Sequence, residues 1–376
     1  MTEETVSTTI EGQEEAVRQY MICNACRHCE GFCPVWDAIE RRSSFAANDL
    51  KFLSYLCHDC RDCFYACPYS EPHEFGLNIP KVNSSIRVQV HRDETWPKSF
   101  TRILNGGSLV GSLIFAVSAI LLFSVTVLLN GPESIIAPQK SVYNVTPPSL
   151  LFYSGMILGF YVIIMWMIQG FIFWKDIGGK GFFNLRSHGR TIYDILSHRW
   201  FKGGGVGCDY PKETGTATRM FFHAFMLFGI LLTILSTSSA AFMQHLLGYY
   251  PPYPYLSLPV LSGTLGGIMI LVGGFGFIHM KRLSDKNKAD STMIKMDYWL
   301  VYLLILASLS GLLSMVTRTL PFMGTVFLVH LAIIATLYII APYSKLSHIV
   351  FRYLALVKDK SESMANPQGV VTPTSG

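Results

Sequence analysis

The stretches CNACRHCEGFCP (residues 23–34) and CHDCRDCFYACP (residues 57–68) both follow the pattern C-x-x-C-x-x-C-x-x-x-C-P, and together they hold eight of the nine cysteines. This spacing is typical of a pair of [4Fe–4S] clusters, in which the fourth cysteine of each motif ligates the other cluster. We therefore predict two [4Fe–4S] clusters with exchanged fourth ligands. The first would be held by Cys23, Cys26, Cys29 and Cys67, and the second by Cys57, Cys60, Cys63 and Cys33.

Two other uses of cysteine fit this pattern less well. A structural zinc site uses two C-x-x-C pairs rather than triplets that are followed by a distant Cys-Pro. Disulfide bonds form in oxidising compartments, whereas residues 1–15 are polar and acidic and do not resemble a secretory signal. The ninth cysteine, Cys208, stands alone in a glycine-rich stretch and is expected to be a free thiol.

The rest of the chain has the composition of a membrane protein. Of its 376 residues, 50% are hydrophobic and only 15% are charged. Six apolar stretches reach the roughly 20 residues that a helix needs to cross a bilayer. They should be helices, because lipid offers no hydrogen bonds to an unpaired backbone. The predicted spans are about 108–129, 150–173, 219–243, 259–280, 298–317 and 322–345.

Lysine and arginine are distributed unevenly among the segments that connect these spans. They are abundant before the first span, after the sixth span and in the connections 174–218 and 281–297. They are sparse in the connections 130–149, 244–258 and 318–321. The positive-inside rule then places both termini in the cytoplasm. The net charge of +5 reflects this asymmetry, and no basic stripe in a soluble domain predicts nucleic-acid binding.

These features predict an all-α protein, in which a small helical di-cluster ferredoxin domain precedes a six-helix transmembrane bundle. Leu50, Leu53 and Leu56 have helical spacing between the two motifs, with Asn48 as a candidate N-cap. The predicted divisions are a disordered tail at 1–11, the ferredoxin domain at 12–98, the transmembrane haem b domain at 99–357 with its cytoplasmic loop 174–218, and a C-terminal tail at 358–376.

Histidines in or beside the spans are candidate haem ligands, because an ionisable side chain inside a bilayer is a functional candidate by default. Bis-histidine ligation needs two imidazoles at one depth on facing helices. Counting along the spans pairs His223 with His348 near the cytoplasmic face, and His245 with His330 near the outer face. The inner pair is our first choice for one haem b. The outer pair would hold a second haem or supply alternative ligands, and His279 is a further candidate at the inner face. A hydrogen-bonded histidine without a haem is the alternative at each position.

Further stretches carry a resemblance that covers nearly the whole chain. They are GGGVGCDYP (203–211), RMFFHAF (219–225), STSSAA (236–241) and YSKLSHIVFR (343–352). Together with the double cysteine motif and the six spans, they resemble the tricarballylate/citrate utilization protein B family. That family implies a multi-pass protein of the bacterial inner membrane. It also implies that the protein reoxidises a cytoplasmic FAD-dependent tricarballylate dehydrogenase-like flavoprotein and delivers the electrons to membrane quinone.

Two local resemblances concern parts of the chain. The stretch that contains His330, Pro342 and His348 resembles the last haem-binding helix of nitrate reductase gamma subunits, and RMFFHAF (219–225) resembles an earlier haem helix of the same subunits. Thr233 stands where that family has a second histidine, which disfavours a haem at the outer pair. The cysteine-rich part also resembles the ferredoxin domains of heterodisulfide reductases.

We therefore expect an electron-transfer subunit whose partner flavoprotein oxidises the substrate, because no strand–turn–helix frame surrounds the glycine-rich stretches to make a nucleotide site. One alternative is a membrane subunit of a different dehydrogenase or reductase. Another is a transporter or sensor with a redox-sensing domain. A transporter would need broken helices and polar groups at the midplane, whereas the glycines of the fourth span indicate close helix packing.

Overall fold

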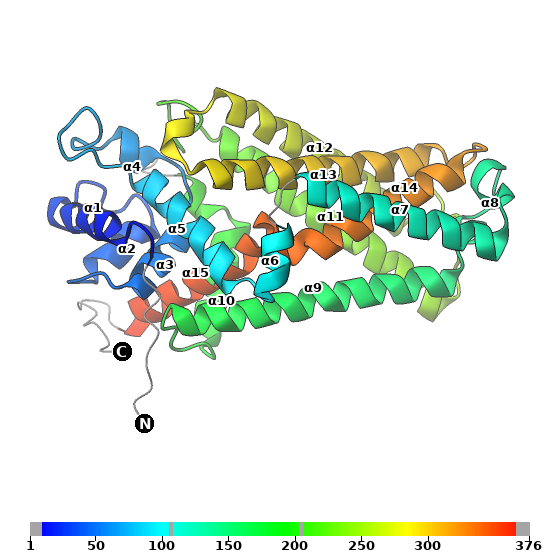
Figure 1. Ribbon diagram of the computed structural model, residues 1–376, viewed down its shortest axis with the longest axis horizontal. Helices are drawn as coiled ribbons and strands as arrows, with labels where there is room; N and C mark the ends of the chain where they lie inside the picture. The colour runs from blue at the N-terminus through cyan, green and yellow to red at the C-terminus, as the bar shows by residue number, and fades with distance from the viewer. Residues whose placement is uncertain (1–9, 105–107, 203–206, 366–376) are drawn as a thin grey trace.

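The computed structural model describes residues 10–104, 108–202 and 207–365. Figure 1 shows a group of short helices at one end of an elongated bundle of long helices. No strand occurs in these described segments, where one isolated bridge joins Cys208 to Thr216. The predicted all-α class, with a small domain before a bundle of six long apolar helices, is confirmed.

The short helices α1 to α5 form the N-terminal domain. They are α1 (Gln13–Cys26), α2 (Pro34–Glu40), α3 (Ala47–Leu56), α4 (Asp62–Tyr65) and α5 (Ile79–Glu94). Leu50, Leu53 and Leu56 of α3 are fully buried, as their helical spacing predicts. They share one hydrophobic core with Tyr20 of α1 and Val90 of α5. Burial of this kind contributes about 1.5–3 kcal/mol for each large apolar side chain.

In two helices of this domain, a polar side chain accepts a backbone N–H group at the start of the helix. Asn78 caps α5, because its side-chain oxygen accepts the backbone N–H of Lys81 at 3.1 Å. The N-cap predicted for α3 is wrong, because Asn48 lies inside the helix. The carboxylate of Asp49 accepts the backbone N–H of Ala46 at 3.2 Å instead.

The bundle consists of six helices that are long and apolar enough to cross a membrane. They are α7 (Ser108–Asn130), α9 (Pro148–Asp176), α11 (Thr218–Leu247), α12 (Leu258–Leu283), α13 (Ser291–Val316) and α14 (Met323–Ile340). The shorter α6 (Lys98–Leu104) and α8 (Glu133–Ile136) flank α7, and α10 (Leu185–Leu196) lies within the predicted loop 174–218. The chain is therefore a multi-pass membrane protein.

Helices α11 and α12 approach each other closely through glycines. A Cβ atom added to Gly266 of α12 would lie 2.7 Å from the carbonyl oxygen of Gly229 on α11. A Cβ atom added to Gly273 would lie 2.8 Å from the carbonyl oxygen of Phe222. The glycines of the fourth span thus serve helix packing, as expected from the sequence. They hold α11, which carries His223, tightly against α12.

The contact at Gly266 makes a testable prediction. We expect Gly266→Ala to destabilise the purified protein by about 1–3 kcal/mol, because the methyl group meets backbone atoms that cannot move aside cheaply. Thermal unfolding in detergent, followed by size-exclusion chromatography, measures this change. Gly155→Ala on α9 is the matched control, because nothing lies within 4 Å of its added Cβ. Equal melting of the two variants would show that the close contact does not contribute to stability.

The sixth span ends earlier than predicted. Helix α14 stops at Ile340, two short 3-10 turns follow at Ala341–Tyr343 and Lys345–Ser347, and α15 begins at His348. Pro342 explains the break, because proline lacks the N–H group and its ring clashes with the preceding turn of a helix. The candidate membrane span runs from Met323 to Tyr343, close to the predicted 322–345, but it is not one continuous α-helix, and His348 belongs to a different helix from His330.

Helix α15 (His348–Ala365) also corrects the predicted tails. Residues 358–365 belong to this helix, and Asp359 is buried in an ion pair with Arg41 at 2.5 Å. Glu362 pairs with Arg42 of the N-terminal domain at 2.9 Å. At the other end, Ile10 is buried in the core of that domain. Residues 1–9 and 366–376 of the two predicted tails lie outside the described residues.

The N-terminal domain shares its core with the end of the bundle helix α9 and with α15, which follows the bundle. Phe173 of α9 and Phe351 of α15 have no exposed surface, and their ring centroids lie 4.9 Å apart. Tyr55 of α3 packs edge-on against both rings at 5.3 Å. Leu354 of α15 joins the same core. The domain is therefore seated on the bundle by buried apolar contacts as well as by ion pairs.

Candidate metal centres

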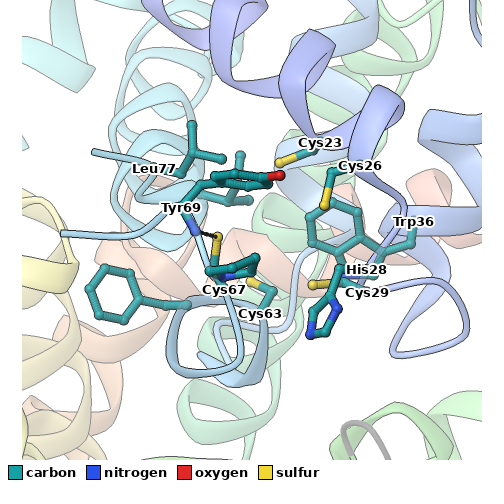
Figure 2. A pocket seen from close by; sticks show the side chains of 12 residues that line it. Cys23, Cys26, His28, Cys29, Trp36, Cys63, Cys67, Tyr69 and Leu77 are labelled. Carbon is teal, nitrogen blue, oxygen red and sulfur yellow. Dashed lines mark hydrogen bonds between the residues drawn. The ribbon is translucent and has the colours of Figure 1, made fainter. Parts of the chain in front are cut away.

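The first predicted set of cysteines lines one cavity, which we call the first pocket. Cys23, Cys26 and Cys29 come from the end of α1 and the turn after it, and Cys67 comes from the second motif. Figure 2 shows their sulfur atoms around one space that Trp36, Tyr69 and Leu77 also line. The structure thus brings this set together across the two motifs.

The second predicted set lines another cavity, the second pocket. Cys57, Cys60 and Cys63 of the second motif line it together with Cys33 of the first motif. Cys63 also lines the first pocket, so it lies in the wall between the two cavities. Each motif therefore contributes its fourth cysteine to the other pocket, in the exchange that the spacing predicts.

Local backbone conformation aims amide groups at these sulfur atoms. Asp59 and Arg61 adopt positive φ angles of 53° and 71°, which curl the loop after Cys57. The backbone N–H of Asp59 donates to Cys57 Sγ at 3.4 Å, and the backbone N–H of Tyr69 donates to Cys67 Sγ at 3.3 Å. Such bonds stabilise sulfur that carries negative charge.

The two cavities fit iron–sulfur clusters in their donor atoms. Five cysteines line the first space and four line the second, with Cys63 counted in both, and the walls are mostly apolar. No three His, Cys, Asp or Glu side chains of the described residues converge on a single metal ion. Burial raises the pKa of the Cys29 thiol to about 12, with Cys67 and Cys26 adding to the effect. The Cys29 thiol therefore keeps its proton near neutral pH, and loading of iron would release it.

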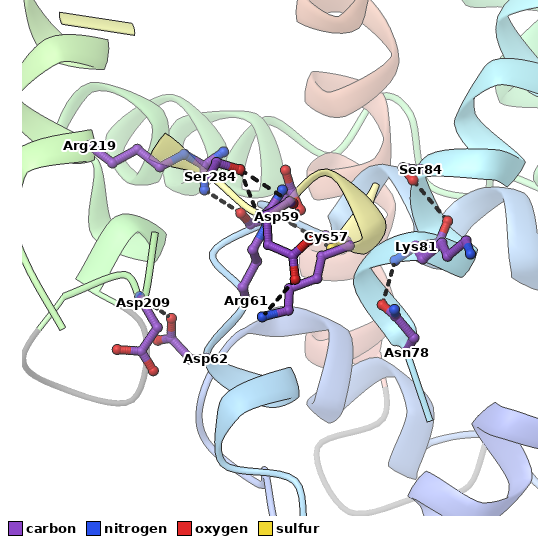
Figure 3. A network of polar contacts seen from close by, with 12 residues as sticks. Cys57, Asp59, Arg61, Asp62, Asn78, Lys81, Ser84, Asp209, Arg219 and Ser284 are labelled. Atoms are coloured by element: carbon purple, nitrogen blue, oxygen red, sulfur yellow. Dashed lines mark hydrogen bonds and ion pairs between the residues drawn. The ribbon is translucent and has the colours of Figure 1, made fainter. Parts of the chain in front are cut away.

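The second pocket adjoins the bundle. Arg219 of α11 donates to the carbonyl of Asp59 at 2.6 Å, and Arg352 of α15 donates to the carbonyl of Cys57 at 3.3 Å. Figure 3 shows Arg219 reaching the loop after Cys57 from the bundle side. Arg61, which lines this pocket, donates to the hydroxyl of Ser284 after α12 at 2.9 Å. Hydrogen bonds thus tie the loop of the second set of cysteines to α11, to α15 and to the residue after α12.

The inner histidine pair lies where the second pocket meets the bundle. His223 belongs to α11, and His348 is the first residue of α15. The two imidazoles are close enough for the charge of one to act on the other. Nδ1 of His348 donates to the carbonyl of Lys345 at 2.5 Å. Burial lowers the pKa of His348 to about 4, with Lys345 adding to the effect, so the ring is neutral near pH 7.

A third histidine orients His223, and the sequence analysis missed it. Nε2 of His198 lies 3.0 Å from Nδ1 of His223, and Nδ1 of His198 lies 3.2 Å from the carbonyl of Leu196. Only a donor faces a carbonyl, so His198 carries its proton on Nδ1 and accepts the Nδ1–H of His223. In both His223 and His348, Nε2 then keeps a lone pair, and no described residue hydrogen bonds to it. Metal-bound histidines usually have this arrangement.

The outer histidine pair is arranged differently. His245 is exposed on α11, and its ring packs against Phe152 of α9 with centroids 4.1 Å apart. Nδ1 of His330 on α14 lies 3.0 Å from the hydroxyl of Ser310 on α13. The two side chains contact different helices, so the described contacts do not join this pair. His279 is exposed near the end of α12.

Cys208 is buried beside the second pocket. Its thiol lies in hydrogen-bonding contact with Cys60 and donates to the carbonyl of Phe201 at 3.2 Å. Cys60, Phe201 and Cys208 share one small hydrophobic core with Met280 of α12. Cys208 thus neighbours a predicted ligand, although it does not line either pocket. No local signal in the sequence predicts this contact, because 147 residues lie between Cys60 and Cys208 along the chain.

Comparisons with known proteins cover both parts of the chain. Residues 16–93 match the model of the "Citrate utilization protein B Fer4-like domain", and residues 105–369 match that of "Citrate utilization protein B". The curated citrate utilization protein B of Escherichia coli is 31% identical over 367 residues, which cover 96% of this chain and 95% of the relative. No solved structure matches the chain.

Proposed function

Because the chain belongs to the citrate utilization protein B family, we propose that it transfers electrons from a cytoplasmic flavoprotein to quinone in the bacterial inner membrane. The proposed donor is an FAD-dependent dehydrogenase of the tricarballylate dehydrogenase type, which oxidises the substrate itself. The N-terminal domain and both termini would face the cytoplasm, as the distribution of lysine and arginine indicates.

The observation that carries this proposal is the meeting of two ligand types at one end of the bundle. The second pocket is tied to α11 and α15, and these helices carry His223 and His348. When bound at these positions, two [4Fe–4S] clusters and one haem b would accept and release electrons one at a time. Two cores join the elements that carry these residues: α15 packs into the core of the N-terminal domain, and Phe222 of α11 packs against the core that contains Cys60 and Cys208.

The orientation of the two imidazoles supports their assignment as haem ligands. Lys345 fixes the ring of His348 and His198 fixes that of His223, each through Nδ1. Each Nε2 lone pair is therefore available to an iron ion. The described contacts do not bring His245 and His330 together, so we propose a single haem b.

The overall reaction needs no site on this chain for the substrate that the partner flavoprotein oxidises. The flavin hydroquinone of the partner loses two electrons and two protons. The quinone gains two electrons and takes up two protons to become a quinol. The cysteine and histidine sites divide this exchange into single-electron steps.

Composition and spectrum of the intact protein test this proposal. Protein purified from membranes without oxygen should contain about eight non-haem irons and about eight sulfides per chain, as two [4Fe–4S] clusters require. It should also show a reduced-minus-oxidised spectrum of bis-histidine haem b, and a soluble quinone analogue should reoxidise it after dithionite reduction. A colourless preparation would overturn the electron-transfer proposal, and a missing haem signal would remove the haem alone.

The donor is tested separately. A reduced flavoprotein of the tricarballylate dehydrogenase type should reduce the haem in the purified protein, and the reduction should stop when the eight motif cysteines cannot hold clusters. Reduction by quinol alone would indicate a membrane subunit of a reductase that moves electrons in the other direction.

A further inference from the structure

The two helices that carry the candidate haem ligands each present an arginine one turn nearer to the N-terminal domain. On α11, Arg219 precedes His223 by four residues, and on α15, Arg352 follows His348 by four residues. Residues four apart lie on the same face of a helix. Each arginine is therefore aligned with its histidine along the helix, between the histidine and the cysteine motifs.

Both arginines bind the backbone of the second cysteine motif. Arg219 donates to the carbonyl of Asp59 at 2.6 Å, and Arg352 donates to the carbonyl of Cys57 at 3.3 Å. These carbonyls belong to residues two apart in one loop, although the arginines come from different helices. The loop is therefore held from two sides by the helices that carry the haem ligands.

The charges of these arginines act on the second set of cysteines. Arg219 interacts electrostatically with Cys60, and Arg352 interacts with Cys57 and Cys33. Nη2 of Arg352 is buried and has no hydrogen-bond partner among the described residues. A buried cation without a counter-ion is costly. Four thiolates around an iron–sulfur core carry the negative charge that would compensate for it.

The first pocket has different electrostatic surroundings. The charges that act on Cys23 are those of other cysteines, and those that act on Cys29 are other cysteines and Asp62. Asp62 acts on Cys60 of the second set as well, so the two pockets differ in the charges of Arg219 and Arg352 beside the second pocket rather than in carboxylate charge. Net charge near a cluster is one of the factors that set its reduction potential.

We propose that Arg219 and Arg352 hold the second pocket against the haem helices and raise the reduction potential of its cluster above that of the first cluster. This inference rests on the proposed function and specifies the order of its steps. Positive charge favours the reduced state, because that state carries one more negative charge. One electron at a time would then pass from the first cluster to the second and on to the haem, with no bond formed or broken.

Redox titration of the purified full-length protein, followed by electron paramagnetic resonance, tests the inference. We expect Arg352→Gln and Arg219→Gln each to lower the potential of the second cluster by about 59 mV, which is a tenfold change for one electron. The first cluster should be unchanged. Cys60→Ser alters the spectrum of the second cluster and so identifies it. Arg92→Gln is the matched control, because that arginine is exposed on α5 and pairs with its neighbour Asp93.

Equal shifts of both clusters, or no shift in either glutamine variant, would overturn the inference. If the glutamine variants lose iron, the lysine variants decide, because lysine keeps the charge. Arg352→Lys and Arg219→Lys should retain both clusters at unchanged potentials, and a tenfold effect in either would contradict a role for charge. A selective shift without quinone reduction would leave this inference intact and overturn only the proposed function.

Discussion

Replacing His348 with alanine is expected to reduce the haem b content of the purified protein from about one per chain to background. His348 is neutral, its Nδ1 is held by the carbonyl of Lys345, and no described residue hydrogen bonds to its Nε2. In the proposed site, loss of one of the two imidazoles would remove half of the protein ligands that would hold the haem. The pyridine haemochrome assay measures the haem, and the non-haem iron should stay at about eight per chain.

His279→Ala is the control for this variant. His279 lies near the end of α12 and is exposed, so its replacement should leave the haem spectrum unchanged. Full haem content in His348→Ala, together with loss in His279→Ala, would transfer the ligand assignment to His279. Loss in His198→Ala but not in His223→Ala would make His198 the ligand rather than the residue that orients it.

Replacing Cys63 with serine should have the largest effect on the iron–sulfur centres. Cys63 is a predicted ligand of the second cluster and also lines the first pocket. Serine would present a hydroxyl to iron that prefers thiolate, and the wall between the two cavities would lose its sulfur atom. We therefore expect the non-haem iron to fall from about eight to below four per chain. Iron and sulfide assays on anaerobically purified protein measure it.

Two other cysteines provide the comparison. Cys26 lines only the first pocket, so Cys26→Ser should lose about four irons, which is one cluster. Cys208 lines neither pocket, and Cys208→Ser should retain about eight irons. Equal iron in the Cys26 and Cys63 variants would show that the two clusters form independently of their shared wall. Loss of iron in Cys208→Ser would make the ninth cysteine part of the second centre.

The features predicted from the sequence are those with a strong local pattern. The exchange of Cys33 and Cys67 between the two pockets follows from the spacing of each motif, because three closely spaced ligands leave the fourth to come from elsewhere. The long spans follow from uninterrupted apolar composition. The glycines around Gly266 predict a close helix contact, because small residues let two helix backbones approach each other.

The features that were missed depend on contacts between distant segments. Nothing near His198 in the sequence indicates that it meets His223, since the contact depends on how the connection 174–218 folds back. The charged end of α15 resembles a tail until its partners are known. Asp359 is buried there because Arg41, 318 residues earlier, compensates for its charge. Pro342 accounts for the end of α14, whereas the apolar composition around it predicts a span that continues past it.

The core shared by α3, α9 and α15 has a consequence for biosynthesis. Phe351 and Leu354 complete the apolar interior of the N-terminal domain, yet a ribosome makes them more than 330 residues after Tyr20. The first domain to emerge is therefore also among the last to be finished. Until the final helix arrives, its half-built interior would face solvent. Iron insertion by the cell would accordingly follow membrane integration, and a truncated N-terminal fragment would aggregate rather than mature.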